Sequence, residues 1–431
     1  MRALARASTA ALSPPVVSVM HPSPSFLIVG GGIAGLSASI ALASQGHSIE
    51  LIEQNPAFQE VGAGLQLSPN AWRCMRQWGL EEALLEICSL PEAIVARNMA
   101  TGEVLGRQPL AGHALRRFGA PYGTALRTDL HRILLEKARQ FSQFSAVMGS
   151  QALALHQDGA RVTVQLRSRL ASEMTADALL VADGARSKLA ASLLPQFEPM
   201  RSGYTAYRGL LRQSALPFRL RTTTVNAWMG RHLHAITYPV QQGHFLNVVI
   251  VVSERILSHL SQRGPADFPA LLATIEQQQP LFPKLKDLCL AIDSHGINTM
   301  GGRWTEWPLR IRAPVRDPDE LAIGRVALLG DAAHPMVPFL AQGAAMAIED
   351  AEQLRQSLQA QPQLGAALAH YAHARAQRCG RVQRGALRNG RIFHLSGPLA
   401  LGRNLVIKTM TQQAMDRPWL YAGGPIPASS L

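Results

Sequence analysis

The sequence predicts an α/β protein that combines a parallel-stranded lobe, an interleaved antiparallel β-sheet lobe and C-terminal helices. Two observations support this fold class. Short apolar runs that end in glycine turns recur in three separated parts of the chain, as expected for a parallel sheet assembled from distant segments. Between them, residues 94–105 and 204–300 alternate apolar and polar residues, which is typical of antiparallel strands.

Composition limits the classes of protein to be considered. Charged residues are only 16% of the 431-residue chain, which leaves enough apolar sequence for a sizeable buried core. The four cysteines are scattered without zinc-ligand spacing, so we predict neither a metal site nor a disulfide framework. We predict a reducing, cytoplasmic compartment for the same reason. No apolar run approaches the roughly 18 residues that a membrane-spanning helix needs, so we predict no transmembrane segment.

The formal net charge of +13 raises the question of a nucleic-acid or membrane partner. Much of this charge is local, because no acid occurs between Gln353 and Met415. Six arginines recur there at helical spacing: Arg375, Arg378, Arg381, Arg384, Arg388 and Arg391. We interpret them as a solvated helix face that mildly attracts an anionic substrate or cofactor. No aromatic residues are interleaved with them to stack on bases, so we predict no nucleic-acid partner.

Residues 1–25 precede the first predicted strand and are expected to be a disordered extension. They contain two arginines, many alanines and serines, and no acid. The segment is either a transit peptide or an upstream-extended start with Met20 as the working initiator, and we favour the second interpretation.

A strand, a glycine-rich turn and a helix open the first predicted lobe. The run Phe26–Val29 is apolar and partly β-branched, as expected of a buried parallel strand. A Gly-x-Gly-x-x-Gly turn leads into a helix of small residues at 32–44, and a second strand at 48–52 ends in Glu53. This is the Rossmann-like order of strand, glycine turn, helix, strand and acid.

The glycines and the acid predict a site for a dinucleotide. Gly30 permits the tight turn, Gly32 lets the backbone approach a pyrophosphate, and Gly35 lets helix and strand pack closely. The helix N-terminus attracts the phosphates, and the Glu53 carboxylate accepts ribose hydroxyls. Ala34 is included among these cofactor contacts. The pattern alone does not distinguish NAD from FAD.

Another apolar strand, near residue 325, ends in a Gly-Asp turn, and a loop with two prolines leads to a helix that starts near Gln342. This arrangement suits the ribitol hydroxyls of a flavin on Asp331, and the negative charge of a reduced flavin ring at the helix start, with Gln342 and Gly343. An ordinary strand-loop-helix crossover explains it equally well. The intervening turn at Asp183 and Gly184 is generic when taken alone.

Taken in order, these three motifs resemble those of the class A flavoprotein aromatic hydroxylases, which have the para-hydroxybenzoate hydroxylase fold. Three stretches are similar to the salicylate and 3-hydroxybenzoate 6-hydroxylase branch: VGAGLQLSPNA at 61–71, GDAAHPMVPFLAQGAAMAIEDA at 330–351, and RNGRIFHLSGPLALGRNLVI at 388–407. The resemblance runs from about Phe26 to the C-terminus. It implies FAD, held at the ADP end by the glycine turn and Glu53 and at the ribitol by Asp331.

The resemblance also implies further contacts and shows two departures. Gly64, Arg127, Asp183 and Gly184 join the predicted cofactor contacts. The branch usually has a histidine before Arg127, where this chain has Leu126. Pro338, in the predicted flavin loop, is a predicted substrate contact. The 3-hydroxybenzoate enzymes carry a glutamine at this position, and this departure weakens the assignment of 3-hydroxybenzoate as the substrate.

The reaction implied by the resemblance is hydroxylation of a small phenolic acid with O2 and NADH or NADPH. Only one Gly-x-Gly-x-x-Gly occurs, so the nicotinamide binds transiently, as it does in that family. In the family, reduced flavin and O2 form a C4a-hydroperoxide whose distal oxygen attacks an electron-rich ring. The protein is expected to act as a monomer or a homodimer.

Removing the phenol proton activates the ring, and a histidine suits this task at neutral pH. In RHLHAITYPV, a strand would place His234 and Tyr238 on the same face, and both match pocket residues of the 3-hydroxybenzoate enzymes. We therefore predict His234 as the base and Tyr238 as its hydrogen-bonding neighbour. Without the resemblance, His234 would be interpreted as a strand histidine bonded to a carbonyl. Arg208 pairs either a substrate carboxylate or a structural acid.

The predicted boundaries follow from these motifs. The FAD-binding lobe comprises residues 26–90, 112–199 and 301–375; the substrate-covering sheet comprises 91–111 and 200–300; and the C-terminal helical segment comprises 376–431. Two alternatives stay open. One is hydroxylation of a larger quinone or secondary-metabolite precursor. An exposed apolar entry helix would favour this alternative, and no such helix is evident in the sequence. The other is a flavin-binding interaction protein without turnover.

Overall fold

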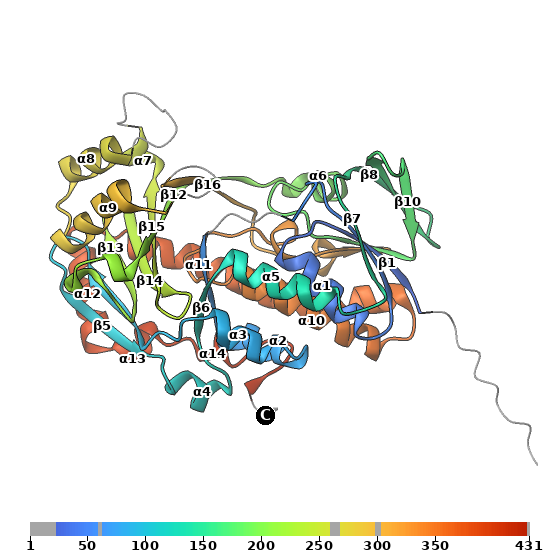
Figure 1. Cartoon of the computed structure of the whole chain (residues 1–431), viewed down its shortest axis with the longest axis horizontal. Helices are drawn as coiled ribbons and strands as arrows, with labels where there is room; N and C mark the ends of the chain where they lie inside the picture. The colour runs from blue at the N-terminus through green and yellow to red at the C-terminus, as the bar shows by residue number, and fades with distance from the viewer. Residues whose placement is uncertain (1–22, 59–62, 259–267, 298–302, 429–431) are drawn as a thin grey trace, which may run out of the picture.

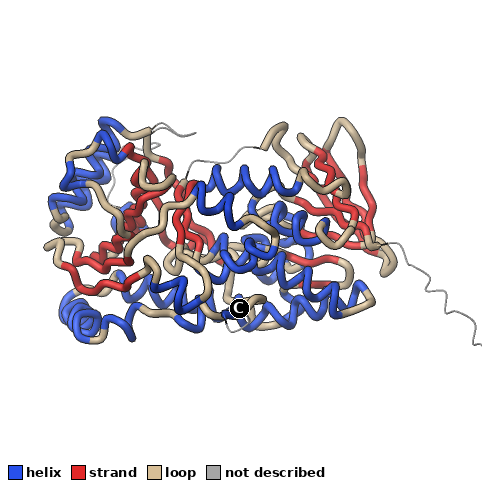
Figure 2. The backbone as a smooth tube through the Cα atoms, turned by 60° about the horizontal axis from the view of Figure 1, so that its bottom comes forward, coloured by secondary structure: helices blue, strands red, loops and turns tan. Residues whose placement is uncertain are grey.

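The computed structural model describes residues 23–58, 63–258, 268–297 and 303–428. Two lobes form an elongated molecule, with a mainly parallel sheet in one and a larger sheet in the other (Figure 1). Strands gather toward both ends of the molecule, and helices run between them (Figure 2). Most of the predicted N-terminal extension lies outside the described residues.

Within the described residues, the first lobe is built on a six-stranded sheet of order β17-β18-β11-β1-β2-β7. The strands are β1 (Ser25–Val29), β2 (Ser48–Ile52), β7 (Phe144–Val147), β11 (Ala178–Val181), β17 (Ala322–Ile323) and β18 (Val326–Leu328). β1 pairs in parallel with β2 and β11, and β17 runs antiparallel to β18. The strands predicted before the three turns are confirmed, because their apolar residues form the buried centre of the sheet.

Four helices flank this sheet and carry much of the site. They are α1 (Ile33–Ala43), α5 (Arg127–Ala138), α10 (Gly343–Ala360) and α11 (Leu364–Phe393). α1 consists of small and apolar residues, is buried along its whole length, and packs against both α5 and α10. α10 begins directly after Gln342, as predicted. α11 continues without a break past residue 375, where the sequence analysis placed a boundary.

The second lobe is, within the described residues, a seven-stranded sheet of order β16-β12-β15-β14-β13-β4-β5. The strands are β4 (Ala93–Asn98), β5 (Val104–Pro109), β12 (Met200–Arg212), β13 (Val225–Gly230), β14 (Leu233–Val240), β15 (Phe245–Ser253) and β16 (Thr305–Ile311). The sheet is not wholly antiparallel as predicted, because β4 pairs with β13 in parallel. β16 pairs with β12 and so extends the sheet beyond residue 300.

The two faces of this sheet have different partners. On one face, apolar side chains of β12, β14 and β15 pack under α8 (Phe268–Gln278) and α9 (Pro283–His295). On the other face, Ala206 and Val251 pack against Phe339, which lies in the loop before α10. Because side chains alternate along a strand, every second residue faces this loop and the first lobe.

The remaining elements complete the two lobes. Two small sheets are formed by β3 (Gly64–Leu67) with β6 (Gly123–Leu126), and by β8 (Gln151–Gln157), β9 (Val162–Arg167) and β10 (Glu173–Ala176). The shorter helices are α2 (Pro69–Gln77), α3 (Glu81–Ile87), α4 (His113–Phe118), α6 (Lys188–Leu193), α7 (Glu254–Leu257), α12 (Gly397–Thr409), α13 (Thr411–Met415) and α14 (Pro418–Tyr421). Single 3₁₀ turns are η1 (Pro195–Phe197), η2 (Gln213–Ala215), η3 (Phe218–Leu220), η4 (Pro318–Glu320) and η5 (Gly330–Ala332). Among the described residues, no helix has the length and apolar character needed to cross a bilayer.

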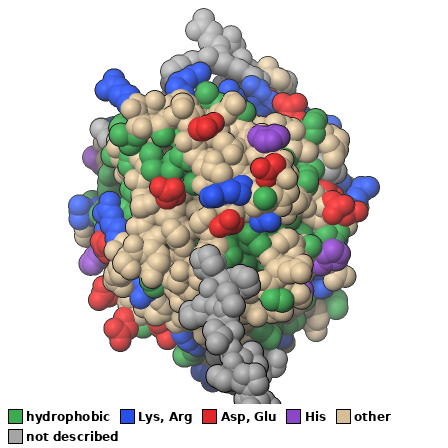
Figure 3. All heavy atoms as spheres, turned by 90° about the vertical axis from the view of Figure 1, so that its right-hand side faces the viewer, with side chains coloured by type: hydrophobic (Ala, Val, Ile, Leu, Met, Phe, Trp, Pro, Cys, Tyr) green, Lys and Arg blue, Asp and Glu red, His purple; other side chains and the backbone are tan. Residues whose placement is uncertain are grey.

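Part of the positive charge lies inside the fold. The interpretation of the α11 arginines as a solvated face is wrong for Arg375, which is 1% exposed, and for the half-buried Arg378. The other four arginines of the pattern are exposed. At the end of the molecule seen in Figure 3, acidic and basic side chains are interspersed, so the positive charge does not gather on that face.

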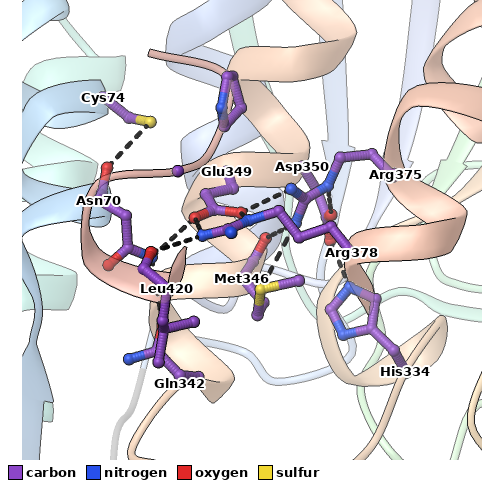
Figure 4. Close-up of polar contacts among 12 residues, drawn as sticks. Asn70, Cys74, His334, Gln342, Met346, Glu349, Asp350, Arg375, Arg378 and Leu420 are labelled. Atoms are coloured by element: carbon purple, nitrogen blue, oxygen red, sulfur yellow. Dashed lines mark hydrogen bonds and ion pairs between the residues drawn. The ribbon is translucent and has the colours of Figure 1, made fainter. Parts of the chain in front are cut away.

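Arg375 and Arg378 bind two carboxylates in the middle of α10 (Figure 4). Arg375 donates from Nη1 to Glu349 over 2.6 Å and from Nε to Asp350 over 2.8 Å. Arg378 donates to both oxygens of Glu349, over 2.6 and 2.7 Å. Burial alone would raise the pKa of Glu349, but the two guanidinium groups hold this pKa at about 2. Buried charges therefore join α10 to α11.

We expect Arg375→Met to lower the free energy of unfolding by about 3–5 kcal/mol, because the buried Asp350 loses its guanidinium partner and Glu349 loses one of its two cations. Denaturant unfolding of the purified protein measures this loss. Arg388→Met is the matched control on the exposed side of the same helix, where a change below about 0.5 kcal/mol is expected. Equal losses in the two variants would contradict a structural role for the buried network.

Candidate functional site

The glycine turn after β1 is shaped by two close backbone approaches. Gly30 has a φ of +107°, and a Cβ there would lie 2.4 Å from the carbonyl oxygen of Ala182, directly after β11. A Cβ on Gly35 would lie 1.9 Å from the carbonyl oxygen of Gly30, so only a glycine allows this contact. At Gly32, by contrast, the nearest atom to a Cβ is an Arg127 guanidinium nitrogen 3.8 Å away. The start of α1, with Ala34 in its first turn, therefore leaves room for a phosphate group.

Glu53 and His131 hold this turn from two sides. Glu53 accepts the N–H of Gly31 over 2.8 Å and the N–H of Asn55 over 2.9 Å. Nε2 of His131, on α5, lies 2.7 Å from the carbonyl oxygen of Gly31. The sequence analysis missed His131, because no local pattern connects residue 131 with the glycine turn.

A surface pocket adjoins the turn. It has a volume of about 610 Å³ and is lined by Pro56, Ala57, Phe58, Leu135, Arg139, Phe144, Ser145, Ala146 and Met148. Phe58 also reaches the turn, since a Cβ on Gly31 would lie 2.5 Å from its ring. The turn, the acid and the pocket fit the ADP half of FAD, because they offer N–H groups for a pyrophosphate, a carboxylate for a ribose and a recess for a base.

The other predicted cofactor residues lie along the same edge of the sheet. Asp183 is exposed after β11, and Gly184 has a φ of +84°. Asp331 is exposed in η5, after β18, and its Oδ1 would lie 3.9 Å from a Cβ on Gly343 at the start of α10. Because β1, β11 and β18 are parallel neighbours, their carboxyl ends meet at this edge, where ligands of such sheets bind.

Gln342 and Pro338 have different surroundings. Pro338 is exposed in the loop before α10. The Gln342 side chain is 1% exposed and is bound within the protein, where it donates to Ser68 over 2.9 Å and accepts from Asn70 over 3.2 Å. The side chain therefore links α10 to α2, and only its backbone is left for the predicted role as a cofactor contact.

Several polar side chains share the face of the second sheet that looks toward the first lobe. Arg208 of β12 lies across from Val249, which in turn pairs with Ile236 of β14. His234 and Tyr238 are each two residues from Ile236 and so point the same way. Asn247 pairs with Tyr238 across the strands and lies on the same face. The structure thus brings Arg208, His234 and Tyr238 onto one surface, as the sequence analysis predicted for the last two.

His234 is 2% exposed and has a buried partner that was not predicted. Its Nδ1 lies 2.9 Å from Nε2 of His394, at the end of α11, and its ring meets the ring of Phe339 edge to face. The expected hydrogen bond to Tyr238, and the alternative of a bond to a carbonyl, are both replaced by this histidine pair. Burial and, secondarily, His394 lower the pKa of His234 well below its usual value, so the ring is neutral at pH 7.

Gly64 approaches this surface so closely that no side chain would fit. A Cβ there would lie 2.6 Å from Asn247 and 2.8 Å from Tyr238, and the Gly64 N–H donates to Asn247 over 3.0 Å. Nδ2 of Asn247 is buried without a hydrogen-bond partner among the described residues. The sequence analysis missed Asn247, although a polar residue inside the apolar run FLNVVIVV is a signal. Arg127 starts α5 nearby, and its N–H donates to Ala63 over 2.8 Å.

Arg208 is half-buried and has no carboxylate partner in the described part of the chain. Its guanidinium carbon lies 5.9 Å from the centre of the Trp307 ring. Burial lowers the pKa of Arg208, and interaction with Tyr238 partly offsets this effect. Burial likewise raises the pKa of Tyr238, with Arg208 opposing the shift. The described residues therefore show no structural ion pair for Arg208, and the role of this residue as a partner of a substrate carboxylate stays a prediction.

His334, Asp350 and Cys379 form a buried group whose ligand atoms lie within 4.8 Å of one another, as a metal would require. Asp350 is already engaged, because it accepts from the N–H of Gly330 over 2.8 Å, binds His334 over 2.7 Å and binds Arg375. We therefore interpret the group as part of the buried network. It holds the loop that follows η5 (Figure 4).

The sequence analysis found no exposed apolar helix, and the structure corrects this. α12 turns most of its large apolar side chains outward, whereas its Arg403 and Ile407 are buried. The side chains exposed on α12 and directly after it are Leu399, Leu401, Leu405, Val406 and Met410. The helix packs against β5 and α13, on the lobe that carries Arg208 and His234.

Comparison with known proteins identifies the family of this chain. The FAD binding domain family matches residues 25–274 and 294–386. The chain is 30% identical over 400 residues to a 3-hydroxybenzoate 6-hydroxylase of Polaromonas naphthalenivorans (strain CJ2), covering 92% of this chain and 95% of that protein. It is 32% identical over 406 residues to a 3-amino-4-hydroxybenzoate 2-monooxygenase of Streptomyces cremeus, covering 91% and 94%.

Among solved structures, a salicylate hydroxylase substrate complex has the same fold. Its TM-score is 0.74 at 23% identity, over 94% of this chain and 96% of that chain. The predicted fold and the predicted FAD cofactor are confirmed, because the family match spans both lobes. The chain therefore belongs to the FAD-binding class A flavoprotein hydroxylases, which are aromatic monooxygenases.

Proposed function

We propose that this protein hydroxylates a small phenolic acid of the salicylate or 3-hydroxybenzoate type, with NADH or NADPH and O2 as co-substrates. The observation that carries the proposal is Arg208. Its guanidinium has no carboxylate partner in the described residues, and it shares one sheet face with His234 and Tyr238. A cation and a neutral histidine on one face suit a ring that bears both a carboxylate and a phenol.

The FAD would lie along the carboxyl edge of the parallel sheet. Gly30, Gly32 and Glu53 would hold its ADP half, and Asp331 with the start of α10 would hold the ribitol and the ring end. Once reduced by NAD(P)H, bound FAD supplies the activated oxygen for hydroxylation. Enclosure between the two lobes excludes water from the reacting atoms.

The chain's own residues orient the substrate and take its proton. Arg208 binds the carboxylate through charge-assisted hydrogen bonds. Nε2 of His234 makes no hydrogen bond within the described residues, so it is free to accept the proton of the phenol hydroxyl. Loss of this proton makes the ring electron-rich at the carbon to be attacked. Tyr238 and Asn247 line the same surface and contribute further polar contacts.

The relatives support this substrate class. The two curated relatives are named for hydroxybenzoates, and the solved structure is named for salicylate. The compounds in all three names are phenols that carry a carboxylate. Pro338 in place of the glutamine of the 3-hydroxybenzoate enzymes leaves the choice within the class to experiment.

A larger and more apolar substrate is the second candidate, and α12 is the observation that favours it. Its exposed leucines lie on the lobe that carries the sheet face. An apolar surface of this kind suits the approach of a quinone or a secondary-metabolite precursor.

The first experiment is product analysis of aerobic reactions of the FAD-loaded protein. NADH and NADPH are each tested with salicylate, 3-hydroxybenzoate, 4-hydroxybenzoate and hydroxynicotinates, and products are separated by chromatography. We expect one acid to yield a hydroxylated product in step with NAD(P)H oxidation. If every acid only releases hydrogen peroxide, the phenolic-acid proposal fails and the larger substrate replaces it.

Arg208→Met should raise the KM for the preferred acid by about 10- to 100-fold, because a charge-assisted hydrogen bond contributes about 1.5–3 kcal/mol. The same variant should affect the corresponding phenol without its carboxylate much less. Steady-state kinetics on both compounds measure the difference. Arg201→Met, exposed on the same strand, is the control. An unchanged KM for the acid in Arg208→Met would remove Arg208 from the substrate site.

A further inference from the structure

We propose that His394 is a proton relay, which takes from His234 the proton that leaves the substrate phenol and passes it through Tyr204 to solvent. This inference rests on the proposed function, because it requires a phenol bound at His234. It adds a residue from the C-terminal end of α11 to a site that is otherwise built from the second sheet and the first lobe.

The relay is a continuous chain of hydrogen bonds. Nδ1 of His234 lies 2.9 Å from Nε2 of His394, and Nδ1 of His394 lies 3.2 Å from the hydroxyl oxygen of Tyr204. The exposed fraction is 2% for His234 and 9% for His394, whereas Tyr204 is half-buried. The chain therefore runs from a buried base toward the surface.

A substrate phenol at Nε2 of His234 selects one direction of proton movement along these hydrogen bonds. With Nε2 of His234 open to the substrate, Nδ1 of His234 carries a proton and donates it to Nε2 of His394. His394 in turn donates from Nδ1 to the oxygen of Tyr204. Each imidazole can therefore accept a proton on one nitrogen while it releases one from the other.

The transfer balances without any oxidant or reductant. The phenol O–H bond breaks as an N–H bond forms on Nε2 of His234. The Nδ1–H bond of His234 breaks as an N–H bond forms on Nε2 of His394. The Nδ1–H bond of His394 breaks as its proton moves to the Tyr204 oxygen, which releases its own hydroxyl proton to water. After product release, the Nε2 proton of His234 passes to water in the emptied site, and a proton from solvent moves back through Tyr204 and His394, which restores the starting tautomers.

The packing around the chain closes the direct route to water. The ring of Phe339 meets His234 edge to face with centroids 4.8 Å apart, and Phe393 does so at 5.3 Å. Phe339 also packs against Tyr204 at 5.5 Å. His394 is held by its backbone, whose N–H donates to Gly390 over 3.2 Å. A proton on His234 therefore has a hydrogen-bonded partner in His394 and apolar rings elsewhere.

Electrostatics favours release of the proton. The groups that interact with His394 are His234, Tyr204, His232 and Arg403, and Tyr204 interacts with Arg255 and Arg391. None of them is a carboxylate. Burial, aided by His232 and Arg403, lowers the pKa of His394 to about 4. Because the pKa values of His234 and His394 are both lowered, a proton taken from the phenol would return to the phenolate unless it left the histidine pair. The relay gives this proton a path to solvent.

The test follows ionisation of a bound phenol without turnover. The FAD-loaded protein is mixed with the preferred phenolic acid in the absence of NAD(P)H. Stopped-flow absorbance then reports phenolate formation, and a pH-indicator dye reports proton release. We expect His394→Gln to slow proton release by roughly 100-fold, while the Kd for the acid stays within about threefold, because the loss affects transfer rather than binding.

A second variant separates a relay from a residue that only orients His234. In His394→Ala, added imidazole should restore much of the rate, whereas an equal concentration of a bulky buffer should not. His373→Gln is the matched control, since His373 is exposed on the same helix and its ring bonds only to the carbonyl of Ala369. This control should behave like the wild type.

The outcomes distinguish the two proposals. If wild type ionises the bound phenol and both His394 variants release protons at the wild-type rate, the relay is wrong and the proposed function stands. If the variants are slow but imidazole restores nothing and the Kd rises, His394 positions His234 and carries no proton. If wild type ionises none of the acids, the proposed function itself fails.

Discussion

The rest of the site depends on the hydrogen bonds and ion pair of the buried Asp350 carboxylate. It accepts the N–H of Gly330, binds His334 and binds Arg375 at the same time, all in the interior. It therefore fixes the turn that presents Asp331, and the loop that ends at the start of α10. Phe339 belongs to this loop and contacts His234, so the loop held by Asp350 connects the cofactor edge with the substrate face. Removing Arg375, the cation bound to Asp350, should therefore disturb both the cofactor edge and the substrate face.

The two lobes divide the chemistry between them. The parallel sheet offers N–H groups and carboxylates at its carboxyl edge, where a dinucleotide fits. The second sheet uses strand alternation to place a cation, a neutral histidine and two further polar side chains on one face. Its other face is sealed by α8 and α9. Gly64 allows the lobes to touch, because any side chain there would collide with Asn247 and Tyr238.

Local patterns allowed much of this to be predicted from the sequence. The glycine turn, Glu53 and the start of α10 are each encoded within a few residues. His394 and Asn247 were missed because they join the site through contacts between residues far apart in the chain. The same limit led to the wrong interpretation of Arg375, since helical spacing cannot reveal that this residue is buried and bound to Glu349 and Asp350. The outward leucines of α12 were overlooked because the sequence does not show that Arg403 is buried while these leucines are exposed.

The most direct test of the account is a crystal structure of the protein with FAD and the phenolic acid that it hydroxylates. We expect the flavin ring beside the loop of Pro338, the carboxylate of the acid on Arg208, and the phenol oxygen within hydrogen-bond distance of Nε2 of His234. A substrate whose carboxylate binds elsewhere, or whose phenol oxygen lies away from His234, would contradict the assignment of this sheet face as the catalytic surface.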